Sequence, residues 1–198
     1  MESWTLFRAL LPCVGIIALL GCDAVMDDDT DDDDVTDDDD ATDDDDDDDD
    51  DSASFAWELC INEFMAANAT TVQDDTGAYV DWVELFNLTD EDVELAGFTI
   101  SDDLDNPDKH VLAAPLVVPA HGHLLLWADG LTDLGPEHLG FQLAREGEEL
   151  GLYDPDGTVL NHLEYDEQAT DWSAARMPDG ELDGWIIDAT PTPGQPNE

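Results

Sequence analysis

A nearly unbroken run of aspartate limits how this chain can fold. Between Asp27 and Asp51 every residue is aspartate except five: Thr30, Val35, Thr36, Ala41 and Thr42. The run has almost no apolar surface to bury, and its like charges repel one another, so we expect it to be disordered and extended. At about 3.3 Å per residue it could reach up to roughly 100 Å. We therefore predict an acidic tether within residues 22–54 and a folded domain confined to residues 55–198.

The acidic excess extends beyond the tether and restricts the partners of the chain. The formal net charge is −49, and the basic residues after the aspartate run are Lys109, Arg145 and Arg176. A field of this sign repels phosphate backbones, so we expect no nucleic-acid partner. Among so many acids, we expect Arg176 to form an ion pair with a carboxylate. The same acids attract cations, which leaves open a passive structural role as a cation-binding acidic surface coat.

A short apolar leader precedes the tether. Residues 9–20 (ALLPCVGIIALL) are apolar and follow the single base Arg8. Spanning a bilayer takes about 20 apolar residues, whereas roughly 7–15 behind a basic start are typical of a signal peptide. The leader ends in Leu19-Leu20-Gly21-Cys22. This sequence resembles the lipobox of bacterial lipoproteins, in which the cysteine is acylated and the chain is cut before it.

The lipobox resemblance implies a lipoprotein signal peptide over residues 1–21 and a lipid anchor on Cys22. A thioether-linked diacylglycerol plus an N-acyl chain exceeds the single acyl chain that gives only marginal membrane binding. We therefore expect a cell-envelope location, at the outer membrane or cell surface, with the membrane as a partner through the anchor. The alternative is an ordinary secretory leader that happens to end in a cysteine.

The residues after the tether have the pattern of an all-β domain. Asp81–Asn87 alternates, and we expect Trp82 and Phe86 to anchor one face of a sandwich. No segment sustains a helical period, and many short strands in one domain favour a sandwich or a barrel. We expect the sequence after residue 165 to be irregular. The expected strands are 59–65, 81–87, 93–101 with a bulge at Gly97, 109–112, 116–118, 123–128, 141–143, 149–153 and 158–165.

Several phrases of the domain occur together in the lamin-tail domain family, which this sequence resembles. Their order along the chain is Ile61–Phe64 (INEF), Asp81–Asn87 (DWVELFN), Leu95–Phe98 (LAGF), Val118–Gly122 (VPAHG), Glu148–Leu150 (EEL), Arg176–Gly180 (RMPDG) and Thr192–Asn197 (TPGQPN). The resemblance implies an immunoglobulin-like β-sandwich of lamin-tail type over residues 55–198. Bacterial members occur in secreted and surface proteins as accessory or adhesive modules, and the family brings no catalytic residues to this chain.

One acidic loop is the best candidate for a specific metal site. Asp102, Asp103, Asp105 and Asp108 lie within seven residues and could offer carboxylate oxygens to Ca²⁺. The loop lacks the glycine and closing glutamate of an EF-hand, so the alternative is a solvated loop between strands. His121 and His123 could face one metal, but we interpret them as surface turn residues because no third ligand can be predicted.

The sequence gives no indication of catalysis. It has no nucleophile elbow and no glycine-rich phosphate loop, and we expect the lone Cys60 of the domain to be a buried hydrophobic residue. We therefore expect no enzyme and no cofactor apart from calcium. The function that we predict is a lipid-anchored, non-catalytic cell-envelope protein that presents a lamin-tail-like sandwich to other envelope proteins or surface polymers.

Overall fold

The computed structural model describes residues 58–197, which fold into β-strands without a helix. Within this range, nothing has the length and hydropathy of a membrane-spanning helix. The strands are β1 (Leu59–Met65), β2 (Asp81–Asn87), β3 (Val93–Glu94), β4 (Thr99–Ser101), β5 (His110–Val111), β6 (Val117–Val118), β7 (His123–Ala128), β8 (Gly147–Tyr153), β9 (Val159–Asp166), β10 (Ser173–Arg176) and β11 (Trp185–Asp188).

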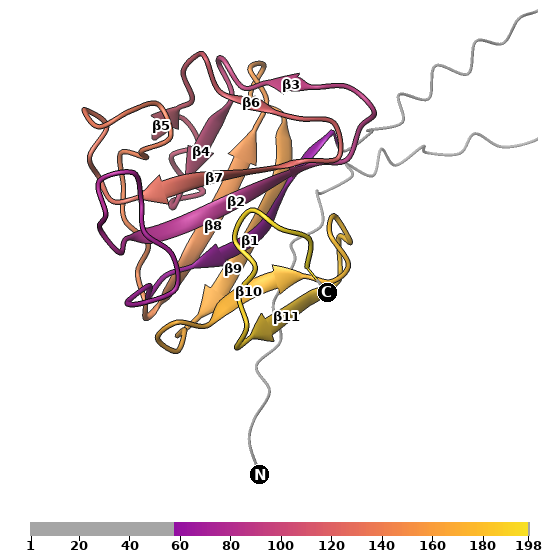
Figure 1. The fold of residues 1–198 in the computed structure, drawn as a ribbon. Coiled ribbons are helices and arrows are strands. Elements are labelled where there is room, and N and C mark those ends of the chain that lie inside the picture. Colours follow the sequence, from indigo (N-terminus) through magenta and orange to yellow (C-terminus); the bar gives the residue numbers. More distant parts are fainter. Residues whose placement is uncertain (1–57, 198) are drawn as a thin grey trace, which may run out of the picture. The chain divides into compact units, whose positions relative to one another are not determined.

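The strands form two main antiparallel sheets and one small ribbon. The five-stranded sheet has the order β11-β10-β1-β2-β7, and the four-stranded sheet has the order β5-β4-β8-β9. The ribbon pairs β3 with β6. In Figure 1, β8 and β9 cross the direction of β2 and β7 at a steep angle. The prediction of an all-β, immunoglobulin-like sandwich is confirmed.

The core lies between the two main sheets. Phe64 of β1 and Tyr165 of β9 meet there, with their ring centroids 4.8 Å apart. Burying an apolar side chain of this size stabilises the fold by roughly 1.5–3 kcal/mol. The other inward-facing side chains include Leu59, Ile61, Val83, Leu85, Leu126, Ile100, Leu150, Leu152 and Leu163.

β2 buries residues on both of its faces. Val83 and Leu85 belong to the core between the sheets, so the alternation of the strand places Trp82, Glu84 and Phe86 on the outer face. Trp82 is fully buried there, and Phe86 packs against His123 with 4.9 Å between the ring centroids. Trp82 and Phe86 therefore share a face as predicted, but it is the outer face of the five-stranded sheet.

The C-terminal residues cover part of that outer face. The backbone N–H of Gly194 donates to Glu84 Oε2 over 2.6 Å, and the backbone N–H of Thr192 donates to Glu63 Oε1 over 3.2 Å. All seven residues of β1 are buried as a result of packing on both sides. The C-terminal residues therefore place the carboxyl groups of Glu63 and Glu84 in the interior of the domain.

Three details of the strand prediction were wrong. Residues 93–101 do not form one bulged strand, because Gly97 adopts a φ of +94° in a turn that sends β3 and β4 into different sheets. Residues 141–143 do not form a strand and contribute only a bridge from Gln142 to Asp129. The sequence after residue 165 is not wholly irregular, since β10 and β11 form one edge of the five-stranded sheet.

Candidate functional site

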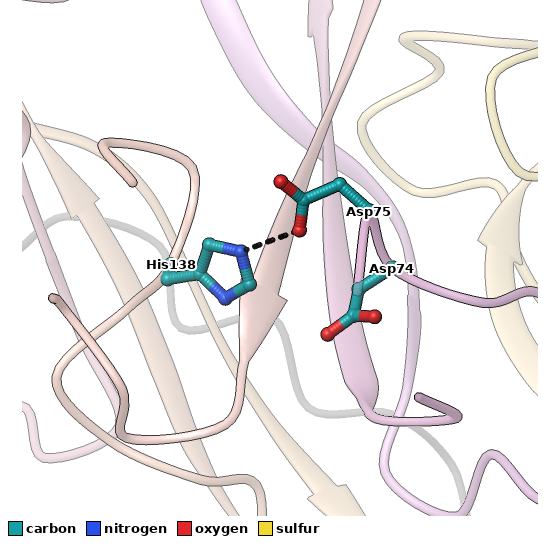
Figure 2. Close-up of side chains that lie close together, drawn as sticks. All are labelled: Asp74, Asp75 and His138. Carbon is teal, nitrogen blue, oxygen red and sulfur yellow. Dashed lines mark ion pairs between the residues drawn. The ribbon is translucent and has the colours of Figure 1, made fainter. Parts of the chain in front are cut away.

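Two loops bring together a cluster that we call the Asp74–His138 cluster, made of Asp74, Asp75 and His138. One ligand atom from each side chain lies within 4.8 Å of the others. The aspartates lie in the loop between β1 and β2, and the histidine lies between β7 and β8. Figure 2 shows Asp75 and His138 facing each other from these separate segments. No three of the other acidic, histidine or cysteine side chains in residues 58–197 converge in this way.

Backbone pairing fixes His138 in its place. The backbone N–H of Trp127 in β7 donates to Glu137 O over 2.7 Å, and the N–H of Leu139 donates to Trp127 O over 2.8 Å. The segment around His138 therefore runs beside β7 like a short additional strand, in a parallel bridge between Trp127 and His138. The imidazole of His138 is 2 % exposed. Its position follows from the sheet and does not depend on a free loop.

A tight turn fixes Asp74. Its Oδ1 accepts hydrogen bonds from the backbone N–H groups of Thr76 and Ala78, over 2.9 and 2.8 Å, and from the Thr76 hydroxyl over 2.8 Å. This is the side-chain-to-backbone pattern that aspartate favours in turns. Burial alone would raise the pKa of Asp74, but these hydrogen bonds lower it below its usual value. The carboxylate is held ionised beside the histidine.

Carboxylates lie on both sides of the His138 ring. Nδ1 is 2.8 Å from Oδ2 of the buried Asp129, and Nε2 is 3.4 Å from Oδ1 of Asp75. The Asp129 carboxylate also accepts the backbone N–H of Leu131 over 2.8 Å. Burial would lower the pKa of His138, but the hydrogen bond and charge of Asp129, together with Asp75, raise it above its usual value.

A surface hollow adjoins this cluster. Its volume is about 410 Å³, and it is lined by His110, Val111, Ala113, Thr132, Asp133, Gly135, Pro136 and His138. Among the lining residues, Val111 is a large apolar side chain that is 56 % exposed. Leu131 and Leu134 do not line the hollow but are sequence neighbours of lining residues, and they are 54 % and 44 % exposed. An apolar concavity with a few polar groups is the form that a binding site takes on a stable scaffold.

The sequence phrases shared with lamin-tail domains meet in a buried polar network. A bulge between Ile61 and Glu63 frees Asn62 from the β1–β2 ladder. The amide of Asn62 donates to Glu84 Oε1 over 3.0 Å and to Asp179 Oδ1 over 2.9 Å, and it accepts the backbone N–H of Gly180. These residues are widely separated in the sequence, so the network joins the C-terminal segment to the sheet.

Burial perturbs the acids of this network. It raises the pKa of Glu84 to about 8, against the lowering effect of hydrogen bonds from Asn62 and Gly194. It also raises the pKa of Glu63, although Ser173 and Thr192 donate hydrogen bonds to that carboxyl group. His123 contacts Asp179, with 3.1 Å between Nε2 and Oδ2. Because these groups bond to backbone and motif residues, we interpret the network as the support of the fold.

Arg176 does not form the predicted ion pair. Its Nε donates to the carbonyl of Ile61 over 2.7 Å, Nη1 donates to the carbonyls of Glu181 and Leu182, and Nη2 donates to Asn161 Oδ1 over 3.2 Å. The guanidinium also lies 4.5 Å from the ring centroid of Trp185. Buried carbonyl oxygens satisfy its donors, so it joins β1, β9 and the C-terminal segment from within.

The predicted calcium loop does not bring three of its carboxylates together. Asp102 forms an ion pair with Lys109, and Asp103 Oδ1 accepts the backbone N–H of Asp105 over 3.1 Å. Asp105 and Asp108 are exposed. Calcium binding by Asp102, Asp103, Asp105 and Asp108 stays a prediction, and a thermal shift at millimolar Ca²⁺ would test it.

The remaining sequence candidates have mixed outcomes. Cys22 lies outside the described residues. Cys60 is buried as expected, and desolvation raises the pKa of its thiol to about 12. His121 is an exposed turn residue beside Asp90, but His123 is not: it begins β7, and its side chain is 9 % exposed.

The Asp74–His138 cluster was missed by sequence reasoning. Gln73–Gly77 (QDDTG) is visible as a turn, but the distant His138 has no motif spacing to it. The contact arises only from the register of β7 with its neighbours. Neither segment contains a sequence pattern that could have identified the cluster.

The antiparallel sandwich, with its buried Asn62 network, defines an immunoglobulin-like β-domain. A comparison with protein families matches the chain to the Lamin Tail Domain over residues 52–167. The chain therefore belongs to the lamin tail domain family. The match ends just after β9, while β10 and β11 complete the five-stranded sheet beyond it. A search of curated proteins finds no match.

Proposed function

We propose that this chain is a lipid-anchored, non-catalytic cell-envelope protein that uses its lamin-tail sandwich as an interaction module. The apolar leader ending at Cys22 supports the anchor, and the aspartate run supports a spacer between the lipid and the domain. The proposed location is the outer membrane or the cell surface. The partners that we propose are other envelope proteins or surface polymers.

The observation that carries the interaction role is the hollow of about 410 Å³ beside β5. Exposed Val111, Leu131 and Leu134 at and beside it would be desolvated by a partner that fills the concavity. A partner of neutral or positive charge suits a chain with a formal net charge of −49. A module of this kind needs no catalytic group.

Substitution of the apolar side chains tests this role. The variant Leu131→Ser/Leu134→Ser, displayed on the full chain, is expected to capture its envelope partner at least about tenfold more weakly, because both exposed side chains neighbour lining residues in the sequence and would be desolvated by the partner. Ile187→Ser is the matched control, since Ile187 is an exposed aliphatic residue of β11. Equal capture by both variants and the unsubstituted chain would contradict the hollow as the binding surface.

A second candidate function is the passive, cation-binding acidic coat, which the net charge of −49 favours. It differs from the first in its response to salt. Electrostatic capture by the tether is screened at high ionic strength, whereas apolar contact in the hollow persists. Capture that vanishes in 1 M salt and ignores the Leu131/Leu134 substitutions would favour the coat.

A further inference from the structure

We propose that Asp74, Asp75 and His138 bind one divalent transition-metal ion of the zinc type, with His138 Nε2 as the nitrogen ligand. The three side chains come from two loops and meet within 4.8 Å. Figure 2 shows the His138 ring with one nitrogen directed at Asp75. The inference is independent of the proposed interaction role, because the ion would bind even if the hollow had no partner.

The spacing of one pair of ligand atoms, from His138 and Asp75, fits a metal ion. Two ligands at 2.0–2.2 Å from a tetrahedral zinc ion stand about 3.4 Å from each other. His138 Nε2 and Asp75 Oδ1 are 3.4 Å apart. A direct hydrogen bond between nitrogen and oxygen spans about 2.7–3.2 Å, so the observed pair is long for one. These two atoms are therefore spaced as neighbouring ligands of one ion.

A second observation is the orientation of the imidazole. Asp129 Oδ2 lies 2.8 Å from His138 Nδ1, and Asp129 is itself fixed by the Leu131 N–H. Binding of the ion displaces the Nε2 proton to solvent. Nδ1–H then donates to this carboxylate, and the lone pair of Nε2 points toward Asp75. Histidine ligands of metals almost always donate their other N–H to a carboxylate or carbonyl in this way.

Asp74 would supply the third ligand, since one of its carboxylate oxygens lies within 4.8 Å of the other two ligand atoms. Its hydrogen bonds from Thr76 and Ala78 all end on Oδ1, so Oδ2 accepts none from the described residues. The Asp75 side chain is 72 % exposed, which gives an ion a path from solvent. With three protein ligands, water completes a four-coordinate shell, as in open zinc sites.

The donor set selects the class of ion. Imidazole nitrogen suits Zn²⁺ and its first-row neighbours, whereas Ca²⁺ and Mg²⁺ take oxygen ligands. The two carboxylates bound by the ion balance its charge of 2+, and Asp129 adds one negative charge beside the imidazole. The ion would also join the β1–β2 loop to the segment after β7, and so stabilise the wall of the hollow that contains His138.

Zinc titration of the full chain tests the site. Calorimetry is run in excess Mg²⁺, so that the oxygen-only sites of the aspartate run are occupied. We expect one site that excess Mg²⁺ does not displace, at least tenfold weaker in Asp75→Asn and in His138→Gln. Asp75→Asn keeps the test valid if the buried histidine variant fails to fold. Titration with Co²⁺ reports geometry, and a His138-dependent visible absorption band is expected.

The matched controls are His121→Gln and Asp90→Asn, which alter an exposed histidine–aspartate pair that lacks a third ligand. Both controls should bind zinc like the unsubstituted chain. If Asp75→Asn also binds like the unsubstituted chain, or if Mg²⁺ displaces all the zinc, the cluster is an ion pair only and the proposal is overturned. Loss of the site in the controls would overturn it equally.

Discussion

At the scale of single residues, burial of Glu84 disfavours the ionised form of its carboxyl group. The side chain is fully buried between the Asn62 amide and the Gly194 backbone. Desolvation raises its pKa from 4.5 to about 8. Between these pH values the folded chain holds a proton that the unfolded chain releases, so stability must fall as the pH rises through this window. The contribution of the Glu84 carboxyl group to the free energy of unfolding is fully present below about pH 4.5.

We therefore predict that unfolding is harder at pH 5 than at pH 8. Glu84→Gln should flatten this dependence, because glutamine has no proton to lose, while Glu94→Gln at an exposed position should keep it. Urea unfolding of all three chains at pH 5, 6.5 and 8 measures the slope. A Glu84→Gln slope equal to that of the unsubstituted chain would assign the effect to other groups, of which buried Glu63 is the first candidate.

At the scale of elements, the hairpin β8–β9 depends on the backbone at Gly147. Its φ is +109°, and a Cβ there would lie 2.5 Å from the carbonyl oxygen of Tyr165 in the paired strand. Gly157, in the turn of the same hairpin, has a φ of +81° with nothing within 4 Å of its Cβ position. The two glycines share a left-handed conformation and differ in the space around them.

This difference gives a prediction for the hairpin. Gly157→Ala should cost about 1–2 kcal/mol of unfolding free energy, for the left-handed conformation alone. Gly147→Ala should cost at least about twice as much, because the β8–β9 register must also shift. Chemical denaturation of both variants at one pH provides the comparison. If both variants lose the same unfolding free energy, the β8–β9 pair accommodates the added Cβ at Gly147 without a further cost, and the prediction is wrong.

How far the elements could be predicted depends on their side-chain pattern. β1, β2 and β7 were predicted with their observed bounds, because each carries a run of large apolar residues between turn residues. β10 has the sequence SAAR, whose two alanines give no alternation. It is a strand because β1 and β11 pair with it on either side, which is a tertiary effect that no local pattern contains.

The functional candidates were less predictable than the strands. The loop Asp102–Asp108 was predicted as a metal site because its acids are close in sequence. In the structure, Lys109 pairs with one of these acids and the backbone N–H of Asp105 bonds to another. The Asp74–His138 cluster joins residues that only the bridge beside β7 brings together. The polar network was visible as family phrases, but its contacts depend on the bulge at Asn62.

At the scale of the whole molecule, the sequence divides into segments of different composition. Apolar residues occur in a short leader and in a lamin-tail domain, and the aspartate run lies between them. An anchor on Cys22 would hold the domain at the membrane through two kinds of acyl group, and the repelling charges of the run would keep the domain at a distance. The proposed location and partners all depend on this anchor.

Mass spectrometry of the N-terminal peptide, after purification of the chain from the cells that make it, tests the anchor most directly. We predict a mature chain that begins at Cys22, carries diacylglycerol and an N-acyl chain, and sediments with the envelope. Cys22→Ser should abolish both the modification and the sedimentation. A chain recovered from the cytosol that still begins at Met1 and bears no fatty acid would contradict the account.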